Sequence, residues 1–358
     1  MSGYVRSIMN KGEKQMALDT LVKALNKKFG AGTIGTPKDL GREHIERLST
    51  GIFSLDIATG GGWPKGRIVE LIGELSAGKT YVANRAIVEC QKEGKAVVYV
   101  DAENCFDKDW AEKIGVNIDD LLIAQPSTGE QTLDIVDAVV RDNQAGLVVV
   151  DSVGAIGATV ELDDSMEKQQ MGVNARMMNK AIRKIHSALN VCGEEGEPNQ
   201  TLIMFINQIR LKIGVMFGSP ETTPGGKGLG FAASVRVKVR KLGFVDAKLK
   251  EKKQHVGQYD AFTIIKNKTF PPYKEGNFQF MFRDVPDGSL KAGQEVHPYD
   301  VILAGIQTEF FERAGSTYKY NGKSYRGENH LVDSFASDPK GLEQLEHEIK
   351  EYALKVRD

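Results

Sequence analysis

The feature that most constrains this chain is the segment GELSAGKT at residues 73–80, which lies between a predicted strand and a predicted helix. It fits G-x-x-x-x-G-K-[S/T], and this context is the one in which the pattern binds phosphate. Gly73 and Gly78 let the backbone curl so that its N–H groups face a phosphate at the helix N-terminus. Lys79 would reach the β- and γ-phosphates, and the Thr80 hydroxyl would bind Mg²⁺. The segment predicts a site for ATP with Mg²⁺.

From about residue 45, short apolar runs rich in β-branched residues alternate with helical stretches. The runs lie at 67–73, 96–103, 146–152, 201–208, 234–241 and 260–268. Nearly continuous apolar strands are expected of a parallel sheet that is covered on both faces. The predicted fold class is therefore α/β, with a mostly parallel twisted sheet. The last two runs alternate apolar and basic residues, so one face of each should contact water.

The N-terminal region carries one amphipathic helix. Its apolar stripe is formed by Leu18, Leu21, Val22, Leu25 and Phe29, at helical spacing. A lone helix cannot bury its stripe on itself, so this helix packs either on its own core or on a neighbouring subunit.

Three parts are predicted along the chain. Residues 1–44 form the amphipathic helix and a linker, and residues 45–288 form the core that carries the phosphate segment. Residues 289–358 have fewer strand signals and end in a helix near 340–356. We expect them to form a small separate α/β domain.

The composition narrows the class of protein further. A formal net charge of −1 means that any nucleic-acid surface must come from local segregation of charge. The chain has three cysteines, an odd number, without CxxC spacing, which argues against a disulfide or zinc framework. No apolar run approaches the ~18 residues of a membrane span, and the N-terminus lacks the apolar segment of a secretory signal. We expect a cytoplasmic protein that does not enter the membrane.

Two carboxylates follow predicted strands. Asp151 ends LVVVD, where an acidic residue can orient Mg²⁺; taken alone it would as readily be a helix N-cap, and the phosphate segment favours the metal role. Glu103 ends VVYVDAE and would polarise a water for attack on the γ-phosphate. Asp101 competes for that role, and a surface carboxylate is the alternative interpretation. These residues predict a nucleoside triphosphatase but not what its hydrolysis drives.

Residues 209–241 are predicted to bind nucleic acid, because they hold seven basic residues and one acidic residue. Their centre, GVMFGSPETTPGGKG, is rich in glycine and proline and is not regular structure. Arg210, Lys212 and Lys227 flank the apolar Met216 and Phe217, which suits a loop that follows a polyanionic strand and inserts apolar groups between bases. The alternative is a solvated loop, for which an exposed GVMFG run would be unusual.

A second basic segment, MGVNARMMNKAIRKI at 171–185, predicts a helix without acidic residues. Arg176, Lys180, Arg183 and Lys184 could meet phosphates or form a solvated face, and charge alone leaves both open. Gln208 joins the strand FINQ to the loop and is a candidate switch between nucleotide state and loop order.

Together these segments resemble the bacterial RecA recombinase family. The resemblance rests on GELSAGKT, VVYVDAE, VVVDSVGAI, MGVNARMMNKAIRK, FINQIRLKIGVMFGSPETTPGG and KNK, in the family's order. It runs from about residue 15 to the final helix and is dense between 47 and 275. It implies a RecA-like P-loop core and a helical homo-polymer on single-stranded DNA. It further implies pairing with homologous double-stranded DNA, strand exchange and DNA-stimulated ATP hydrolysis.

The resemblance also assigns roles by position. Glu103 would activate water, Gln208 would sense the γ-phosphate, and Lys266 and Lys268 would reach the neighbouring subunit's ATP; with Lys79 these are the predicted catalytic residues. The helix at 15–29 would dock on the adjacent core. The predicted nucleotide-binding residues are Gly73, Glu74, Ser76, Ala77, Gly78, Lys79, Thr80, Tyr81, Asp107, Trp110 and Asp151. The predicted metal ligands are Thr80 and Asp151. The predicted DNA-binding residues are Met171, Gly172, Arg176, Arg183, Arg210, Lys212, Met216, Phe217, Gly225, Gly226 and Lys227.

Several positions depart from the family. Trp110 stands where a tyrosine commonly stacks near the adenine, and Asn104 and Cys105 replace the usual His–Ala after Glu103. The segments 193–200 and part of 245–258 look like insertions. The chain stops at VRD without the long acidic tail of many members, so we expect readier loading onto duplex DNA. These departures suggest a divergent or phage-encoded member.

Other functions stay open at this point. A ring-shaped DNA helicase of the same core fold would share the phosphate segment and Glu103, but it gives no reason for GVMFGSPETTPGG. An ATP-gated protein that coats single-stranded DNA would hydrolyse ATP very slowly and independently of DNA. A P-loop kinase would need a lid and an acceptor pocket, for which the chain offers no candidate.

Overall fold

An eight-stranded sheet forms the centre of the molecule, in the order β12-β11-β10-β3-β7-β6-β4-β5. The computed structural model describes residues 11–30, 33–36, 45–157, 172–191, 198–211, 220–249, 252–285, 288 and 290–355. The six strands from β10 to β5 are parallel, and β11 and β12 are antiparallel additions at one edge. The strands are β3 (Ile68–Gly73), β4 (Ala96–Asp101), β5 (Leu121–Ala124), β6 (Ala145–Asp151), β7 (Leu202–Gln208), β10 (Val235–Leu249), β11 (Lys252–Asn267) and β12 (Glu275–Met281). The predicted α/β class with a mostly parallel sheet is confirmed.

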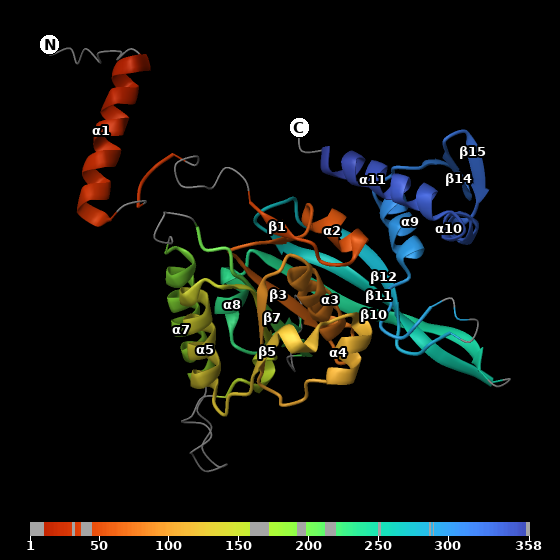
Figure 1. The fold of residues 1–358 in the computed structure, drawn as a ribbon, viewed down its shortest axis with the longest axis horizontal. Helices are drawn as coiled ribbons and strands as arrows, with labels where there is room; N and C mark the ends of the chain where they lie inside the picture. Colours follow the sequence, from red (N-terminus) through yellow and green to blue (C-terminus); the bar gives the residue numbers. More distant parts are fainter. Residues whose placement is uncertain are drawn as a thin grey trace.

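All six predicted apolar runs lie in strands, and the structure adds two strands that the pattern did not indicate. β5 is a short edge strand in which Leu122 and Ile123 are exposed, so it lacks a buried apolar run. In β12, Gly276 and Asn277 precede Phe278, and Gln279 separates Phe278 from Phe280, so this strand also lacks a continuous apolar run. β10 and β11 continue past the predicted runs as one long hairpin, which extends from the molecule in Figure 1.

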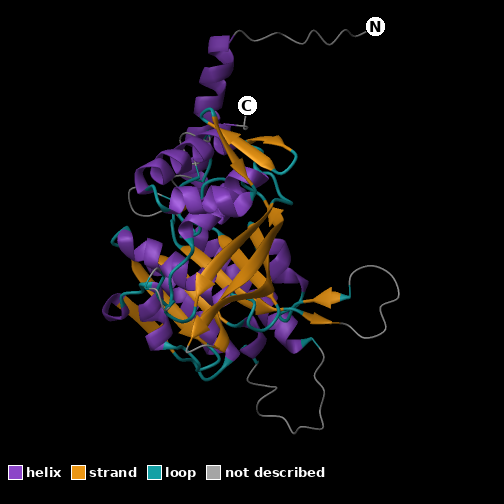
Figure 2. Cartoon of the chain, turned by 90° about the vertical axis from the view of Figure 1, so that its right-hand side faces the viewer, coloured by secondary structure: helices purple, strands orange, loops and turns teal. Residues whose placement is uncertain are grey.

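Helices cover both faces of the sheet because successive strand residues point to opposite sides. Val69 and Leu71 face the cluster that includes α3 (Lys79–Lys92) and α4 (Lys108–Ile114). Ile68 faces the other cluster, which is completed by three helices, α5 (Gly129–Asp142), α7 (Val173–Leu189) and α8 (Lys227–Ala232). Figure 2 shows the strands between these helical layers.

The N-terminal helix α1 (Lys11–Phe29) stands away from the core in Figure 1. Its apolar stripe is largely open to solvent: Leu18 is 46% exposed, Leu21 52% and Phe29 58%. In the single chain, therefore, the stripe does not pack on its own core.

The C-terminal elements pack around a third apolar cluster, to which the early helix α2 (Phe53–Thr59) contributes Phe53 and Ile57. These elements are α9 (His297–Gln307), β13 (Glu312–Ala314), β14 (Thr317–Tyr320), β15 (Lys323–Arg326), α10 (Glu328–Ala336) and α11 (Pro339–Lys355). We call α2 together with these elements the C-terminal lobe. The predicted final helix near 340–356 corresponds to α11.

A buried polar cluster joins this lobe to α3. Asp300 of α9 accepts a hydrogen bond from the backbone N–H of Ser54 (3.0 Å). The Arg85 guanidinium of α3 donates to the Gly51 carbonyl (2.7 Å) and lies 3.8 Å from the Glu295 carboxyl. Burial raises the pKa of both Glu295 and Asp300, and the neighbouring Asp300 carboxyl raises that of Glu295 further, so this pair favours a protonated carboxyl group.

The remaining elements are short. They are β1 (Arg47–Leu48), β2 (Trp63–Pro64), the 3₁₀ turns η1 (Ile118–Asp120) and η2 (Val153–Ala155), β8 (Arg210–Leu211) and β9 (Glu221–Thr222). In the described part of the chain, every helix is too short or too polar to cross a lipid bilayer.

Candidate functional site

The predicted phosphate loop connects the end of β3 to the start of α3, as its sequence context indicated. Both glycines are required, Gly73 by close packing and Gly78 by its backbone conformation. A Cβ at Gly73 would lie 2.3 Å from the Val239 carbonyl oxygen, and Gly78 has φ +77, a left-handed conformation. The loop thus lies at the carboxyl end of a parallel strand and at a helix N-terminus, where an anion is stabilised.

The side chain of Lys79 lies over this loop. Its amine donates to the carbonyls of Gly73 (3.2 Å) and Glu74 (2.6 Å), and the residue is only 7% exposed. Burial lowers the pKa of Lys79, and the nearby carboxylates of Asp151 and Glu103 oppose this effect. The ammonium is therefore held beside the loop before any phosphate arrives.

Asp151 lies beside the first turn of α3. Its Oδ2 accepts hydrogen bonds from the Tyr99 hydroxyl (2.7 Å) and the Thr80 hydroxyl (3.3 Å). Burial raises the pKa of Asp151, while the bonds from Tyr99 and Thr80 lower it. A hydroxyl and a carboxylate are oxygen ligands of the kind that Mg²⁺ takes, and Mg²⁺ sites use few protein ligands because water and phosphate supply the rest. This donor set fits the ion.

Glu103 is exposed and meets residues from two other strands. Its Oε1 accepts from the Ser152 hydroxyl, after β6, and from the Gln208 amide at the end of β7 (3.4 Å). The Cys105 thiol lies 3.7 Å from Oε2. The competing carboxylate, Asp101, is buried and accepts the backbone N–H groups of Cys105 and Phe106 (3.1 and 3.0 Å). Asp101 thus holds the turn after β4, whereas Glu103 faces solvent.

Three of the predicted nucleotide-binding residues, Tyr81, Asp107 and Trp110, lie in different surroundings. Tyr81 is 2% exposed, and its ring stacks on Phe280 at 4.0 Å, inside the core. The predicted nucleotide contact of Tyr81 would therefore come from its backbone, in the first turn of α3, because the aromatic core encloses the ring. Asp107 caps α4 by accepting from the Trp110 N–H (2.9 Å), and the Trp110 ring is partly buried near Phe280.

Lys266 and Lys268 lie away from their own phosphate loop. Lys266 pairs in register with Arg236, which pairs with Glu70, three residues before Gly73. The Lys266 amine donates to the carbonyls of Gly230 and Phe231 at the end of α8 (both 2.7 Å), on the face opposite α3.

Burial, with Lys268 and Arg236 nearby, lowers the pKa of Lys266 to about 8. The amine lies at a cavity of about 780 Å³ that is also lined by Thr222, Lys227 and Phe231. Phe231 is 72% exposed.

The two predicted DNA-binding segments meet where α7 and α8 pack together. Gly172 precedes α7 with φ +86, and Arg176 and Arg183 are exposed along that helix. A Cβ at Gly226 would lie 2.9 Å from the Ala175 Cβ, so the end of the second segment rests on the first turn of α7. Arg210, Gly225 and Lys227 lie in the described part of the second segment. Met171, Lys212, Met216 and Phe217 fall outside the described residues.

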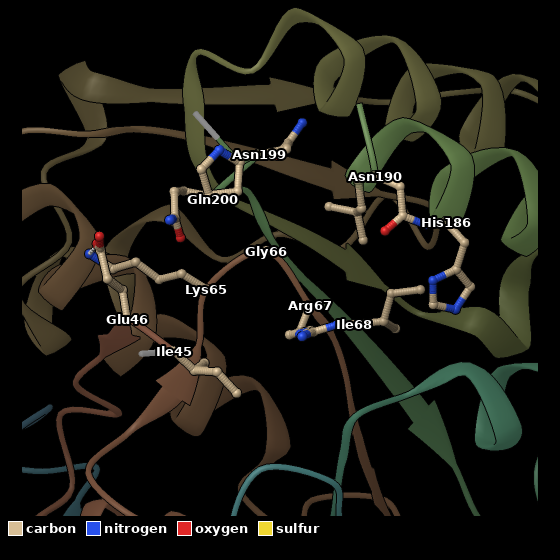
Figure 3. A pocket seen from close by; sticks show the side chains of 12 residues that line it. Ile45, Glu46, Lys65, Gly66, Arg67, Ile68, His186, Asn190, Asn199 and Gln200 are labelled. Atoms are coloured by element: carbon tan, nitrogen blue, oxygen red, sulfur yellow. Dashed lines mark ion pairs between the residues drawn. The ribbon is translucent and has the colours of Figure 1, made fainter. Parts of the chain in front are cut away.

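A further cavity, of about 130 Å³, lies at the amino end of β3 (Figure 3). Arg67 and His186 line it, and Lys65 at its edge forms an ion pair with Glu46 (3.9 Å). Burial lowers the pKa of His186, and Lys268 and Arg67 lower it further. The His186 imidazole is therefore favoured in its neutral form, and this cavity is separate from the phosphate loop.

Sequence reasoning missed four polar residues around the phosphate loop. Tyr99 and Ser152 bind Asp151 and Glu103, and Gln258 and Asp260 pack behind Gly78. Tyr99 had a usable signal, because a tyrosine within an otherwise apolar buried strand needs a hydrogen-bond partner for its hydroxyl group. Gln258 and Asp260 had none, since their approach to the loop depends on the register of an antiparallel strand added at the sheet edge.

The loop between β3 and α3 and the Asp151 carboxylate beside it are arranged as in nucleotide-binding P-loop proteins, at the carboxyl edge of a parallel sheet. The fold and the site therefore define a P-loop nucleoside triphosphatase.

Comparison with known proteins identifies the family. The family model described as the RecA N-terminal domain matches residues 16–285. Protein RecA of Acinetobacter baumannii is 39% identical over 343 residues, which cover 95% of this chain and 93% of that protein. Protein RecA of Colwellia psychrerythraea is 40% identical over 349 residues, covering 97% and 94%, and that of Thioalkalivibrio sulfidiphilus is 38% identical over 347 residues, covering 96% and 95%.

The chain belongs to the RecA family. It is an ATP-dependent recombination protein and a DNA-dependent ATPase. It binds nucleotide and DNA and assembles into filaments. The helicase and coating-protein alternatives give way to this assignment.

Proposed function

We propose that this recombinase binds ATP through residues 73–80 and couples the state of the γ-phosphate to its DNA-binding segments through Glu103 and Gln208. The loop N–H groups and Lys79 hold the phosphates. The observation that carries the proposal is the hydrogen bond between the Gln208 amide and Glu103 (3.4 Å), because Gln208 is the last residue before the DNA-binding segment. Other nucleotide contacts are proposed for Glu74, Ser76, Ala77, Asp107 and Trp110.

Thr80 and Asp151 would hold Mg²⁺, which when bound neutralises charge on the phosphates. The Tyr99 hydroxyl orients Asp151 toward Thr80, and its hydrogen bond lowers the pKa of Asp151 against the effect of burial, which favours the charged carboxylate. Oriented ligands bind a metal more tightly than mobile ones.

Glu103 would remove a proton from the water that attacks the γ-phosphate. Ser152 and Gln208 occupy Oε1 of Glu103 and leave Oε2 with only the weak contact from the Cys105 thiol. A γ-phosphate would offer the Gln208 amide a new acceptor. Gln208 would then leave Glu103 and pull on the strand that leads into the second DNA-binding segment.

ATP would lie between subunits of the filament, with Lys266 and Lys268 supplied by the neighbour. Two features support this arrangement: both lysines lie away from their own phosphate loop, and the stripe of α1 is exposed in the single chain. The stripe would dock on the adjacent core. A trans-acting cation stabilises charge that develops during phosphoryl transfer.

Single-stranded DNA would bind along α7, α8 and the segments that precede them, through Gly172, Arg176, Arg183, Arg210, Gly225, Gly226 and Lys227. Base pairing, not side chains, would then select the homologous double-stranded DNA for strand exchange. We also propose the division into residues 1–44, 45–288 and 289–358, and a cytoplasmic location, where bacterial DNA lies.

The test is Glu103→Gln in the full chain, with Asp109→Asn on α4 as the matched exposed control. We expect Glu103→Gln to retain ATP-dependent binding to single-stranded DNA and to lose ATP turnover by roughly 10²–10⁴-fold, the usual contribution of a general base. Phosphate release and filter binding measure the two properties. Loss of DNA binding along with turnover would contradict the assigned role.

A further inference from the structure

A buried carboxyl group that the proposed mechanism does not use lies directly behind the phosphate loop. Asp260 of β11 is 0% exposed. A Cβ placed on Gly78 would lie 2.1 Å from Asp260 Oδ2, so the carboxyl packs against the backbone at the start of α3. Glycine at position 78 is thus required twice, by its left-handed backbone and by this carboxyl group.

The surroundings of Asp260 supply one hydrogen-bond donor and no paired cation. The Gln258 amide, two residues earlier on β11, donates to both oxygens (3.0 and 2.9 Å). On β10 the register partner is Lys241, whose amine instead lies over the Phe244 ring at 4.6 Å. β12 presents Phe278 and α3 presents Tyr81, which is neutral at physiological pH. Within the described ranges, Asp260 forms no ion pair within 4.0 Å.

A carboxyl group in such a place titrates far from its usual range. Burial raises the pKa of Asp260 to about 7, and the Gln258 hydrogen bond and the more distant Lys241 charge oppose that rise. Near neutral pH, therefore, the group is part acid and part carboxylate.

We propose that Asp260 is a positioning residue of the phosphate loop that takes up one proton from solvent when the nucleoside triphosphate binds and releases it when the nucleotide leaves. The inference rests on the proposed binding of triphosphate to residues 73–80. An ionised Asp260 and the phosphates would place like charges on the two sides of one backbone segment, in a buried region where charge is poorly screened. Protonation removes that repulsion.

Linkage fixes the direction of the effect. If the bound phosphates raise the pKa of Asp260, protonation strengthens nucleotide binding by the same factor. Below pH about 7 the carboxyl is already protonated in the free protein, so affinity does not depend on it. Above that value affinity falls, by up to about tenfold per pH unit, until the pH passes the higher pKa of the complex.

Titration calorimetry of the full chain with Mg²⁺ and a slowly hydrolysed ATP analogue tests the proposal. At pH 7.5, the dependence of the measured heat on the ionisation enthalpy of the buffer gives the number of protons taken up. Because the terminal phosphate of the nucleotide titrates in a similar range, the readout is the difference between wild type and Asp260→Asn. The matched control is Asp56→Asn, which replaces another buried aspartate with a raised pKa (about 6) that binds Ser49 and Thr50.

We expect wild type and Asp56→Asn to take up the same fraction of a proton, and Asp260→Asn to take up measurably less. Affinity should decline between pH 7 and 8.5 in wild type and stay nearly flat in Asp260→Asn. Equal proton uptake in wild type and Asp260→Asn would overturn the proposal. Failure of the wild type to bind nucleotide would instead refute the phosphate-loop assignment, so the two failures are distinguishable.

A second variant keeps the test decisive if Asp260→Asn does not fold. Gln258→Met keeps a side chain of similar length but removes the hydrogen-bond donor that lowers the pKa of Asp260. The decline in affinity should therefore begin at a higher pH than in wild type. A role in packing alone would weaken binding equally at every pH, and an unchanged pH profile in Gln258→Met would overturn the proposal.

Discussion

Two buried groups of carboxylates flank helix α3, and they are stabilised in different ways. Beside the phosphate loop, burial raises the pKa of Asp151, and the hydroxyl hydrogen bonds and the nearby Lys79 oppose that rise and so favour its charged form. At the joint with the C-terminal lobe, Glu295 Oε1 and Asp300 Oδ1 have no hydrogen-bond partner among the described residues, and burial raises the pKa of both carboxyl groups. The comparison shows that hydrogen-bond donors oppose the rise in pKa that burial causes, as at Asp151, whereas a neighbouring carboxyl group adds to it, as at Glu295.

Removing Lys79, the cation beside Asp151, should have the largest effect on ATP turnover and DNA binding. Lys79→Ala should abolish nucleotide-dependent DNA binding and lower ATP turnover by roughly 10³-fold or more, since a positioned charge on the phosphates is lost. Turnover and filter binding with and without ATP measure this. The melting temperature should stay near that of wild type. Burial disfavours the charged Lys79 amine, so removing it relieves a desolvation cost that offsets the lost hydrogen bonds. Retained ATP-dependent DNA binding would contradict the role of Lys79.

Removing the cation from the joint should affect stability instead. Arg85→Met takes away both donors to the Gly51 carbonyl and the charge beside Glu295. We expect the free energy of unfolding to fall by about 3 kcal/mol, as when one partner of a buried pair is removed. Denaturant unfolding measures the loss. A change below about 0.5 kcal/mol, the size of an ordinary surface substitution, would show that Arg85 does not stabilise the joint.

Tyr99→Phe removes one hydrogen-bond donor to Asp151 and leaves the carboxyl group itself in place. Loss of the hydroxyl raises the pKa of Asp151 further, so Mg²⁺ should bind about 10- to 100-fold more weakly, most of all at low pH. The Mg²⁺ concentration needed for half-maximal turnover reports this change. Tyr318→Phe, in the C-terminal lobe, is the control. An unchanged Mg²⁺ requirement would remove Asp151 from the metal site.

The smallest effect is expected from the proton that burial favours on Glu295. Burial raises the pKa of Glu295 well above its ordinary value of 4.5. The stability that this proton contributes is therefore complete below pH about 4.5 and is lost as pH rises toward the pKa of the folded state. Wild type should lose up to about 1.4 kcal/mol per pH unit across that window. Glu295→Gln should reduce this slope, whereas Glu312→Gln on an exposed strand should not; equal slopes would show that Glu295 holds no proton.

The sequence predicted those parts of the site that are local in the chain. The strand–loop–helix at 73–80 and the ends of β4, β6 and β7 follow from continuous patterns, and the structure brings Glu103, Asp151 and Gln208 to one edge of the sheet. The contacts between these residues could not be predicted, because they depend on the order of strands in the sheet. Tyr81 shows the same limit: nothing in the sequence indicated that its ring is buried, because the aromatic core that encloses it is supplied by β12, a strand that the pattern did not indicate.

Strand β11 carries Asp260 and Lys266 on one rigid segment. An extended strand rises about 3.3 Å per residue, so these positions are roughly 20 Å apart, and hydrogen bonds to β10 prevent the strand from stretching. Under the roles proposed here, one end of this rod lies behind a subunit's own nucleotide and the other reaches the nucleotide of its neighbour. The spacing of successive nucleotides along the filament would then be set by the fixed distance between Asp260 and Lys266 along β11. Any change of pitch would come from rotation of whole subunits about this rod, not from extension within a subunit.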